Sequence, residues 1–244
     1  MRVIQLNNSS LLLPDNSSLL SDNSDVNNVL ENYFNTIFWA DNKQVIGQSK
    51  GRNVTWFIQS ELANKAWVLR HYYRGGLVAK IIKDRYLFSS IDNTRVYKEV
   101  ALLEKMIMLG LPVPKPIAGR IQRKGIFYRA DLLMEKLEAN DLAVLLKTTN
   151  LGESLWQSIG KSIAQFHNKG IYHSDLNAHN IMIDDYNKVW LIDFDRCEVR
   201  KKTVSWQKSN IDRLKRSFEK ELEINEGFNF CHRNWCSLLE GYNS

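Results

Sequence analysis

The chain has 244 residues, with 33 Lys and Arg against 27 Asp and Glu, and 44% of its residues are hydrophobic. This length fits one large domain or two modest ones, and the composition excludes collagen-like, coiled-coil and wholly disordered proteins. No apolar run approaches the roughly 20 residues that cross a bilayer, and we expect neither a membrane-spanning nor a secreted protein. The net charge of +6 favours an anionic partner without identifying it.

The N-terminal part is expected to begin with a polar leader, residues 1–28, that is mobile or loosely packed. Asn and Ser crowd the segment from residue 7 to residue 28, so it offers little apolar surface to bury. Strand-like runs rich in Val, Ile and aromatic residues follow at residues 44–50, 54–59 and 66–72. Short polar turns separate these runs, which predicts an antiparallel meander.

A helix is predicted over residues 94–109, because Val, Leu and Ile recur there at steps of three and four and Gly110 can end the helix. Two more strand-like runs, at residues 117–122 and 125–134, complete a small sheet. Together these elements predict an N-lobe over residues 29–135.

The remaining residues, 136–244, predict a mainly helical C-lobe. Apolar residues at helical spacing run from Leu155 to Phe166 and from Ile211 to Leu222. Between them, residues 181–193 are interpreted as a short hairpin. The change of hydrophobic period predicts an α+β fold of two lobes.

The candidate catalytic residues lie in an H-x-D-L-x-x-x-N pattern, which runs from His173 to Asn180, and at the end of the run that follows it. Asp175 can accept a proton from an attacking hydroxyl. The predicted hairpin brings Asn180 and Asp193 together, and their oxygen atoms suit Mg²⁺. Each of these residues alone is also an ordinary turn residue. In this order and spacing they resemble the catalytic core of the protein-kinase-like superfamily, which implies ATP as the phosphate donor.

That resemblance implies that residues of the N-lobe bind the nucleotide. Gly51 and the neighbouring Lys50 lie in a predicted turn whose backbone amides could cover phosphates, although the turn departs from G-x-G-x-x-G and an ordinary β-turn is the alternative. Arg70 stands where the superfamily has a strand lysine, and Glu99 on the predicted helix is its acidic partner. An arginine can pair bidentately with a carboxylate, while a solvent-facing Glu99 is the alternative.

Two departures from protein kinases narrow the acceptor. Ser174 replaces the arginine that usually precedes the catalytic aspartate, so regulation through a phosphorylated activation loop is not expected. No A-P-E follows Asp193 before the helix expected near residue 209, so the platform that holds peptide substrates in protein kinases is not expected either. A protein substrate is therefore not expected, and a smaller hydroxyl acceptor is implied. Basic residues crowd the stretch after Asp193, which favours an anionic acceptor, although each could be a solvated surface charge. They are Arg196, Arg200, Lys201, Lys202, Lys208, Arg213, Lys215 and Arg216.

The run W-V-L-R-H-Y-Y-R-G-G at residues 67–76, followed by K-D-R-Y-L-F at residues 83–88, resembles the bacterial lipopolysaccharide-core kinases that act on 3-deoxy-D-manno-octulosonic acid (Kdo). The similarity covers the chain from about residue 44 onward. It implies ATP-dependent phosphorylation of the 4-hydroxyl of Kdo on a lipid A precursor, by a peripheral protein at the cytoplasmic side of the inner membrane. An arginine at position 70 is usual in that family.

The mixture of basic and large apolar residues at 70–88 also suits an anionic membrane surface, with a partly buried connector as the alternative. No nucleic-acid partner is expected, because no recognition module accompanies the charge. Two other functions stay open at this point. One is an aminoglycoside- or choline-type phosphotransferase, and the other is an inactive pseudokinase, which the unusual glycine turn and Asp195 in place of a glycine would fit.

Overall fold

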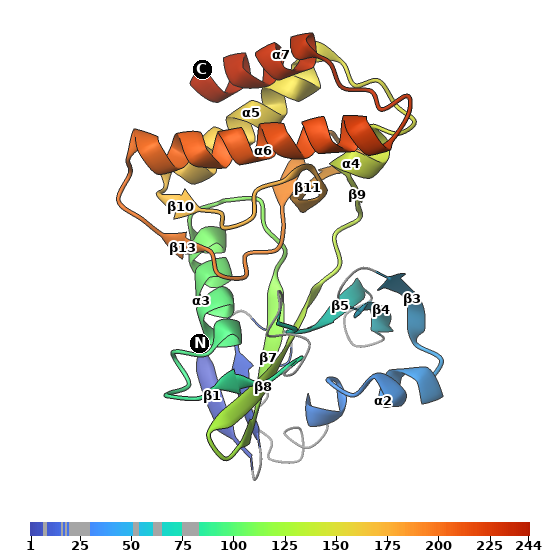
Figure 1. Cartoon of the computed structure of the whole chain (residues 1–244). Helices are drawn as coiled ribbons and strands as arrows, with labels where there is room; N and C mark the ends of the chain where they lie inside the picture. The colour runs from blue at the N-terminus through green and yellow to red at the C-terminus, as the bar shows by residue number, and fades with distance from the viewer. Residues whose placement is uncertain are drawn as a thin grey trace. The chain divides into compact units, whose positions relative to one another are not determined.

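The computed structural model of the chain describes residues 1–6, 9–15, 17, 19, 30–50, 54–60, 65–74 and 83–244. It divides into two compact units, Met1–Glu104 with Lys115–Lys136 and Lys105–Pro114 with Leu137–Ser244. An antiparallel sheet dominates the first unit and helices dominate the second, so the predicted α+β class is confirmed (Figure 1).

The sheet of the first unit has the strand order β1-β2-β7-β8-β5-β4-β3, and β6 pairs with β8. Every pairing is antiparallel, and the predicted meander over residues 44–72 is confirmed as β3, β4 and β5. The strands are β1 (Arg2–Gln5), β2 (Ser9–Leu13), β3 (Val45–Lys50), β4 (Val54–Ser60), β5 (Lys65–His71), β6 (Tyr86–Leu87), β7 (Pro116–Lys124) and β8 (Phe127–Glu135).

Strand β2 contradicts the expectation of a loosely packed leader. All five of its residues are buried, and it pairs with β7 through the register Leu12↔Gly119. Leu11 and Leu13 join a core cluster that includes Trp39 of helix α2 (Thr36–Asp41). Three successive leucines can contribute apolar side chains to both faces of a strand. The prediction was wrong because it rested on the overall composition of residues 7–28, which Asn and Ser dominate. Residues 7, 8, 16, 18 and 20–29 lie outside the described part of the chain.

Helix α3 (Arg95–Met108) packs on the sheet at β7. A Cβ atom added at Gly119 would lie 2.8 Å from Val96 of α3 and 3.3 Å from Leu12 of β2, so helix and sheet are in close contact there. After the helix, Gly110 has φ +72°, a left-handed conformation in which a glycine pays no steric cost. The predicted helix and its end are therefore confirmed.

The second unit is built around the helices α5, α6 and α7 (Figure 1). Helices α5 and α7 touch through their backbones, because a Cβ atom at Gly160 would come within 1.9 Å of the Leu238 carbonyl oxygen. The elements are β9 (Ala139–Asp141), α4 (Leu142–Leu145), α5 (Glu153–Asn168), β10 (Ile171–Tyr172), the 3₁₀ helix η2 (Ala178–Asn180), β11 (Ile181–Asp184), β12 (Val189–Leu191), β13 (Glu198–Val199), α6 (Val204–Ile224) and α7 (His232–Asn243).

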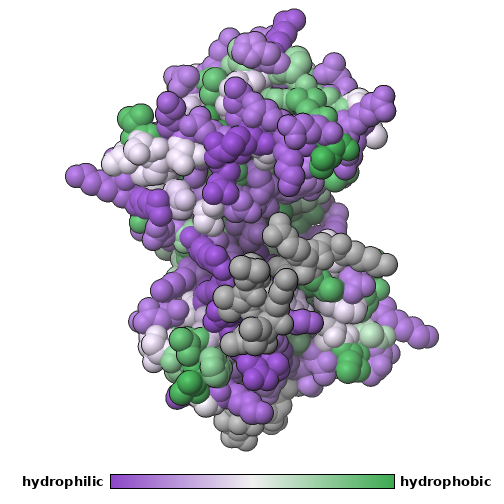
Figure 2. All heavy atoms as spheres, viewed as in Figure 1, coloured by the Kyte–Doolittle hydropathy of each residue, from purple (hydrophilic) through white to green (hydrophobic). Residues whose placement is uncertain are grey.

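Helix α6 differs in two respects from its prediction. It begins at Val204 instead of near residue 209, and Leu222, expected in its apolar stripe, is 40% exposed. Ile211, Leu214 and Phe218 are buried as predicted. The surface over α6 is largely hydrophilic on the face that Figure 2 shows. Within the described residues, no helix combines the length and apolar character needed to span a membrane.

Candidate active site

The first unit holds a buried ion pair between β5 and α3. Arg70 Nη2 lies 2.6 Å from both Oε1 and Oε2 of Glu99, whose residue is 3% exposed. The Tyr72 hydroxyl donates a further hydrogen bond to Glu99 Oε2 at 2.7 Å. The predicted Arg70–Glu99 pairing is therefore confirmed, and the alternative of a solvent-facing Glu99 is wrong.

Tyr72 supports this pair from a fully buried position. Burial raises the pKa of the Tyr72 hydroxyl well above its ordinary value of 10, and the negative charge of Glu99 raises it further. The hydroxyl therefore stays protonated and acts as a donor to the carboxylate. The Arg70 guanidinium also lies 5.0 Å from the Tyr72 ring centroid, within the range of a cation–π contact.

The predicted glycine turn falls largely outside the described residues. Lys50 ends β3, but its side chain is not described, and Gly51 is among the undescribed residues 51–53. Residues 75–82 of the basic and apolar segment are also undescribed. The proposed roles of Lys50 and Gly51 at the phosphates stay predictions.

In the second unit, the hairpin of β11 and β12 brings two predicted residues together. Ile181 pairs with Leu191, and the Ile192 amide donates to the Asn180 carbonyl at 3.0 Å, so Asn180 and Asp193 leave the same end of the hairpin. Asp193 has φ +61°, a left-handed conformation that is uncommon for a residue with a side chain. Such strain is typical of functional positions.

The loop before the hairpin fixes Asn180 and leaves the Asp175 carboxylate accessible. The Asn180 side-chain amide donates to the Asp175 carbonyl at 2.9 Å. Because a carbonyl only accepts, the nitrogen of this amide is used there, and its oxygen is available to a cation. Asn180 is 9% exposed, whereas the side chain of Asp175 is 60% exposed.

His173 is a structural part of this loop. Its Nε2 donates to the Ile192 carbonyl at 2.9 Å, and its Nδ1 accepts from the Asp175 amide at 3.2 Å. Burial lowers the pKa of His173, which keeps the imidazole neutral and able to make both bonds. His173 therefore fixes the loop through hydrogen bonds at both ring nitrogens.

His179 is held between two carboxylates. Its Nδ1 lies 2.8 Å from Asp141 Oδ2 and its Nε2 lies 3.1 Å from Glu221 Oε1. The hydrogen bond to Asp141 is the main cause that raises the pKa of His179 to about 9, and Glu221 adds to it against the opposing effect of burial. Asp141 also caps α4 by accepting from Ala143 at 2.8 Å. The charged His179 thus ties the loop to α4 and α6.

Helix α6 holds the loop through polar residues that the sequence alone did not identify. Polar residues at steps of three and four lie on one face of a helix, beside the apolar stripe that packs into the core. Each of them contacts the loop. We call these residues the polar row of α6; they are Asn210, Arg213, Ser217 and Glu221.

The polar row contacts the loop in chain order. Asn210 exchanges two hydrogen bonds with the backbone of His173, at 3.2 and 3.0 Å. Ser217 Oγ accepts from the Ala178 amide at 3.0 Å. The sequence does place an asparagine beside the apolar stripe of the helix, and a buried asparagine needs hydrogen-bond partners. Only the fold shows that these partners lie in the loop.

Asn180 and Asp193 fit a magnesium ion of the kind that kinases use. Mg²⁺ is usually held by one or two protein oxygen ligands together with substrate phosphates and water. Asn180 offers an amide oxygen that makes no hydrogen bond to the described residues, and Asp193 offers a carboxylate. No group of three or more His, Cys, Asp and Glu side chains among the described residues could form an all-protein metal cage.

A solved structure shows the class of fold. The structure of WaaP in complex with acyl carrier protein superposes with a TM-score of 0.59 at 12% sequence identity, covering 96% of this chain and 88% of that one. The chain thus has the fold of WaaP.

The sequence then identifies the family. The Lipopolysaccharide kinase (Kdo/WaaP) family matches residues 36–242, and the chain belongs to it. Among curated relatives, the 3-deoxy-D-manno-octulosonic acid kinase of Mannheimia succiniciproducens is 47% identical over 87% of this chain and 90% of its own length. The Vibrio parahaemolyticus enzyme of the same name is 44% identical over 85% of this chain and 86% of its own length.

Proposed function

We propose that this enzyme transfers a phosphoryl group from ATP to the 4-hydroxyl of a Kdo residue on a lipid A precursor. The observation that carries the proposal is the 47% identity to a Kdo kinase over almost the whole of both chains. The family match over residues 36–242 also includes every residue to which we assign a catalytic role. A kinase family implies a nucleoside triphosphate donor, and the oxygen donors Asn180 and Asp193 suit its magnesium ion.

Asp175 is proposed as the residue that orients and deprotonates the sugar hydroxyl. The hydroxyl oxygen attacks the γ-phosphorus, the bond from that phosphorus to ADP breaks, and the proton passes to the carboxylate. The loop geometry supports this role, since the Asp175 backbone is fixed while its carboxylate is exposed.

The other assigned residues hold the donor. Asn180 and Asp193 would bind Mg²⁺, which neutralises charge on the phosphates. Arg70, kept in place by Glu99, would contact the phosphates, as would Lys50 and the backbone near Gly51. A guanidinium on a rigid, buried carboxylate is well oriented for such a contact, which supports this role for Arg70.

We also propose that the enzyme acts as a peripheral protein at the cytoplasmic side of the inner membrane. Its acceptor is attached to a lipid, and the net charge of +6 favours an anionic surface. A protein or nucleic-acid substrate is not part of the proposal. The Kdo kinase relatives do not favour an aminoglycoside- or choline-type phosphotransferase or an inactive pseudokinase.

Mass spectrometry of a Kdo-bearing lipid A precursor incubated with the protein, ATP and Mg²⁺ tests the reaction. We expect the precursor to gain one phosphate. Asp175→Ala and Asp193→Ala should each lower turnover by roughly 100- to 10,000-fold while the fold persists, because Asp175 and Asp193 act on reacting groups.

Asp185→Ala is the matched control for these variants. Asp185 is an exposed carboxylate in the turn of the same hairpin, and its removal should leave turnover unchanged. An unmodified precursor, or near-normal turnover by Asp175→Ala, would contradict the proposed function.

A further inference from the structure

We propose that Arg213 binds the carboxylate of the sugar acid acceptor, and that this contact releases Asp175 to receive the sugar hydroxyl. The inference rests on the proposed function and adds a residue that selects the acceptor. It starts from the contact between Arg213 Nη1 and Asp175 Oδ1, which are 3.1 Å apart.

Arg213 differs from the rest of the polar row of α6. Asn210 and Glu221 are 1% and 7% exposed, as expected for residues that hold the loop from a buried position. The side chain of Arg213 is 46% exposed, and that of Asp175 is 60% exposed. Arg213 therefore presents a positive charge to solvent beside the proposed catalytic carboxylate.

The ion pair between Arg213 and Asp175 is of a kind that a ligand can displace. Exposed ion pairs are weak, because water screens both charges and two long side chains must be ordered. One nitrogen of Arg213 contacts Asp175, whereas a guanidinium has donors for two oxygens of a carboxylate at once. An incoming carboxylate can thus bind Arg213 better than Asp175 does.

The acceptor supplies such a carboxylate. An octulosonic acid carries its carboxyl group at C1, on the same sugar as the 4-hydroxyl that is to be phosphorylated. When the hydroxyl lies at Asp175, Arg213 is the adjacent cation that can take the carboxylate. The displaced Asp175 then has a free oxygen for the hydroxyl proton, so recognition of the acid and activation of the hydroxyl are coupled.

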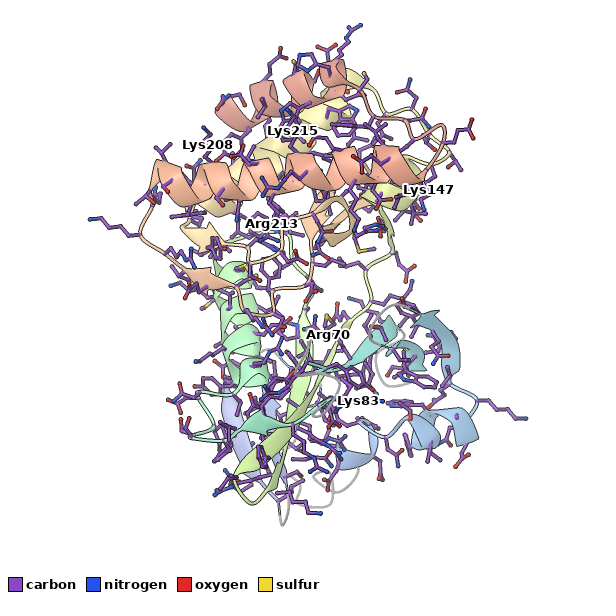
Figure 3. The ribbon with its side chains drawn as sticks, viewed as in Figure 1. Arg70, Lys83, Lys147, Lys208, Arg213 and Lys215 are labelled. Carbon is purple, nitrogen blue, oxygen red and sulfur yellow. The ribbon has the colours of Figure 1, made fainter. Side chains whose placement is uncertain are left out.

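Two other basic residues of α6, Lys208 and Lys215, do not share this position. In Figure 3, Lys208 and Lys215 lie on the side of the helix opposite to Arg213. Their offsets of five and two residues from Arg213 correspond to rotations of about 140° and 160° around the helix axis. Lys215 also pairs with Glu219 at 3.7 Å. The basic cluster that the sequence suggested is thus divided, and Arg213 is a member that contacts the loop, through Asp175.

The experiment compares two acceptors that differ in charge at C1. One is the Kdo-bearing lipid A precursor, and the other is the same precursor with the C1 carboxylate converted to a primary amide. The wild-type enzyme should prefer the acid in kcat/KM by roughly 10- to 100-fold, the usual effect of a lost charge-assisted hydrogen bond. Arg213→Met should lose this preference, and Arg213→Lys should keep part of it.

Lys208→Met is the matched control, since it removes one positive charge from the opposite face of α6. It should keep the full preference for the acid. The inference is overturned if Arg213→Met keeps the preference, or if wild-type enzyme uses acid and amide equally well. Failure of the proposed function looks different, because wild-type enzyme would then phosphorylate neither acceptor.

Discussion

Two pairs of an arginine and a carboxylate lie among the proposed catalytic residues, and they differ in burial. The side chains of Arg70 and Glu99 are 15% and 2% exposed, with both carboxylate oxygens 2.6 Å from one nitrogen. Arg213 and Asp175 are about half exposed and share one contact of 3.1 Å. The same chemistry thus serves two purposes. The buried pair is a fixed part of the framework, and the exposed pair can open for a substrate.

The physical reason is the cost of removing charge from water. A buried ion is tolerated only while its partner and hydrogen bonds are present, so neither member of the Arg70–Glu99 pair can leave. Arg213 and Asp175 keep much of their hydration when they separate, and their separation costs little. The distances alone would not distinguish a framework contact from a displaceable one.

The largest effect is expected from breaking the buried pair. Glu99→Gln keeps the size of the side chain but leaves the Arg70 charge buried without a carboxylate. We expect the free energy of unfolding to fall by about 3–5 kcal/mol, measured by urea denaturation. Lys65→Met, on β5 together with Arg70, removes an exposed partner of Glu135 at 3.1 Å and should cost less than about 1 kcal/mol.

A double variant separates stability from activity at this pair. Arg70→Met combined with Glu99→Gln removes the stranded charge, so part of the lost stability should return. Turnover should stay low, because the phosphates lose their proposed contact with Arg70. A double variant with restored turnover would contradict the assignment of Arg70 to the donor.

The catalytic loop was predictable because its residues are close together in the sequence. The positions of Asp175, Asn180 and Asp193 around a short hairpin require only local geometry, and the structure has that hairpin. The partnership of Arg70 and Glu99 could also be anticipated, since a strand and the following helix of one small sheet place them.

Contacts between distant segments could not be predicted in the same way. Strand β2 pairs with β7, more than a hundred residues later, and its leucine triplet was diluted by the polar residues around it. The residues in the polar row of α6 contact loop residues that lie about 40 positions earlier in the chain. From the sequence alone, these polar residues cannot be told from the solvent-exposed face of a helix. In both cases the local pattern is compatible with several partners, and tertiary packing decides between them.

His167, a buried histidine of the second unit, avoids the cost of burying a charge because it stays neutral, whereas Arg70 and Glu99 are buried as an ion pair. His167 is 2% exposed and its Nδ1 lies 2.7 Å from the Tyr242 hydroxyl. Burial lowers the pKa of His167 to about 4, so the group is accommodated by remaining neutral. In the unfolded chain it binds a proton near its ordinary pKa of 6.5.

The contribution of His167 to stability is therefore complete above pH 6.5 and is lost as the pH falls from 6.5 towards 4. The slope should approach 1.4 kcal/mol per pH unit. The variant His167→Gln can still bond to Tyr242 but has no group that titrates here, so this slope should disappear. Between pH 7 and pH 5, the free energy of unfolding should fall by about 2 kcal/mol more in the wild type than in the variant. Denaturation curves at the two pH values measure the difference, and equal slopes would show that His167 is not buried as a neutral group.

The smallest effect should come from Arg213→Met, which opens the exposed pair. The free energy of unfolding should change by less than about 1 kcal/mol, and salt should weaken even this contribution. The same denaturation series that includes Glu99→Gln measures it. A loss of about 2 kcal/mol or more would mean that Arg213 holds the loop as Asn210 does, because a displaceable contact cannot also carry that much stability. A small change in stability together with a large change in acceptor preference would instead show that the arginine is kept for the substrate, which is the distinction that burial alone draws between the two pairs.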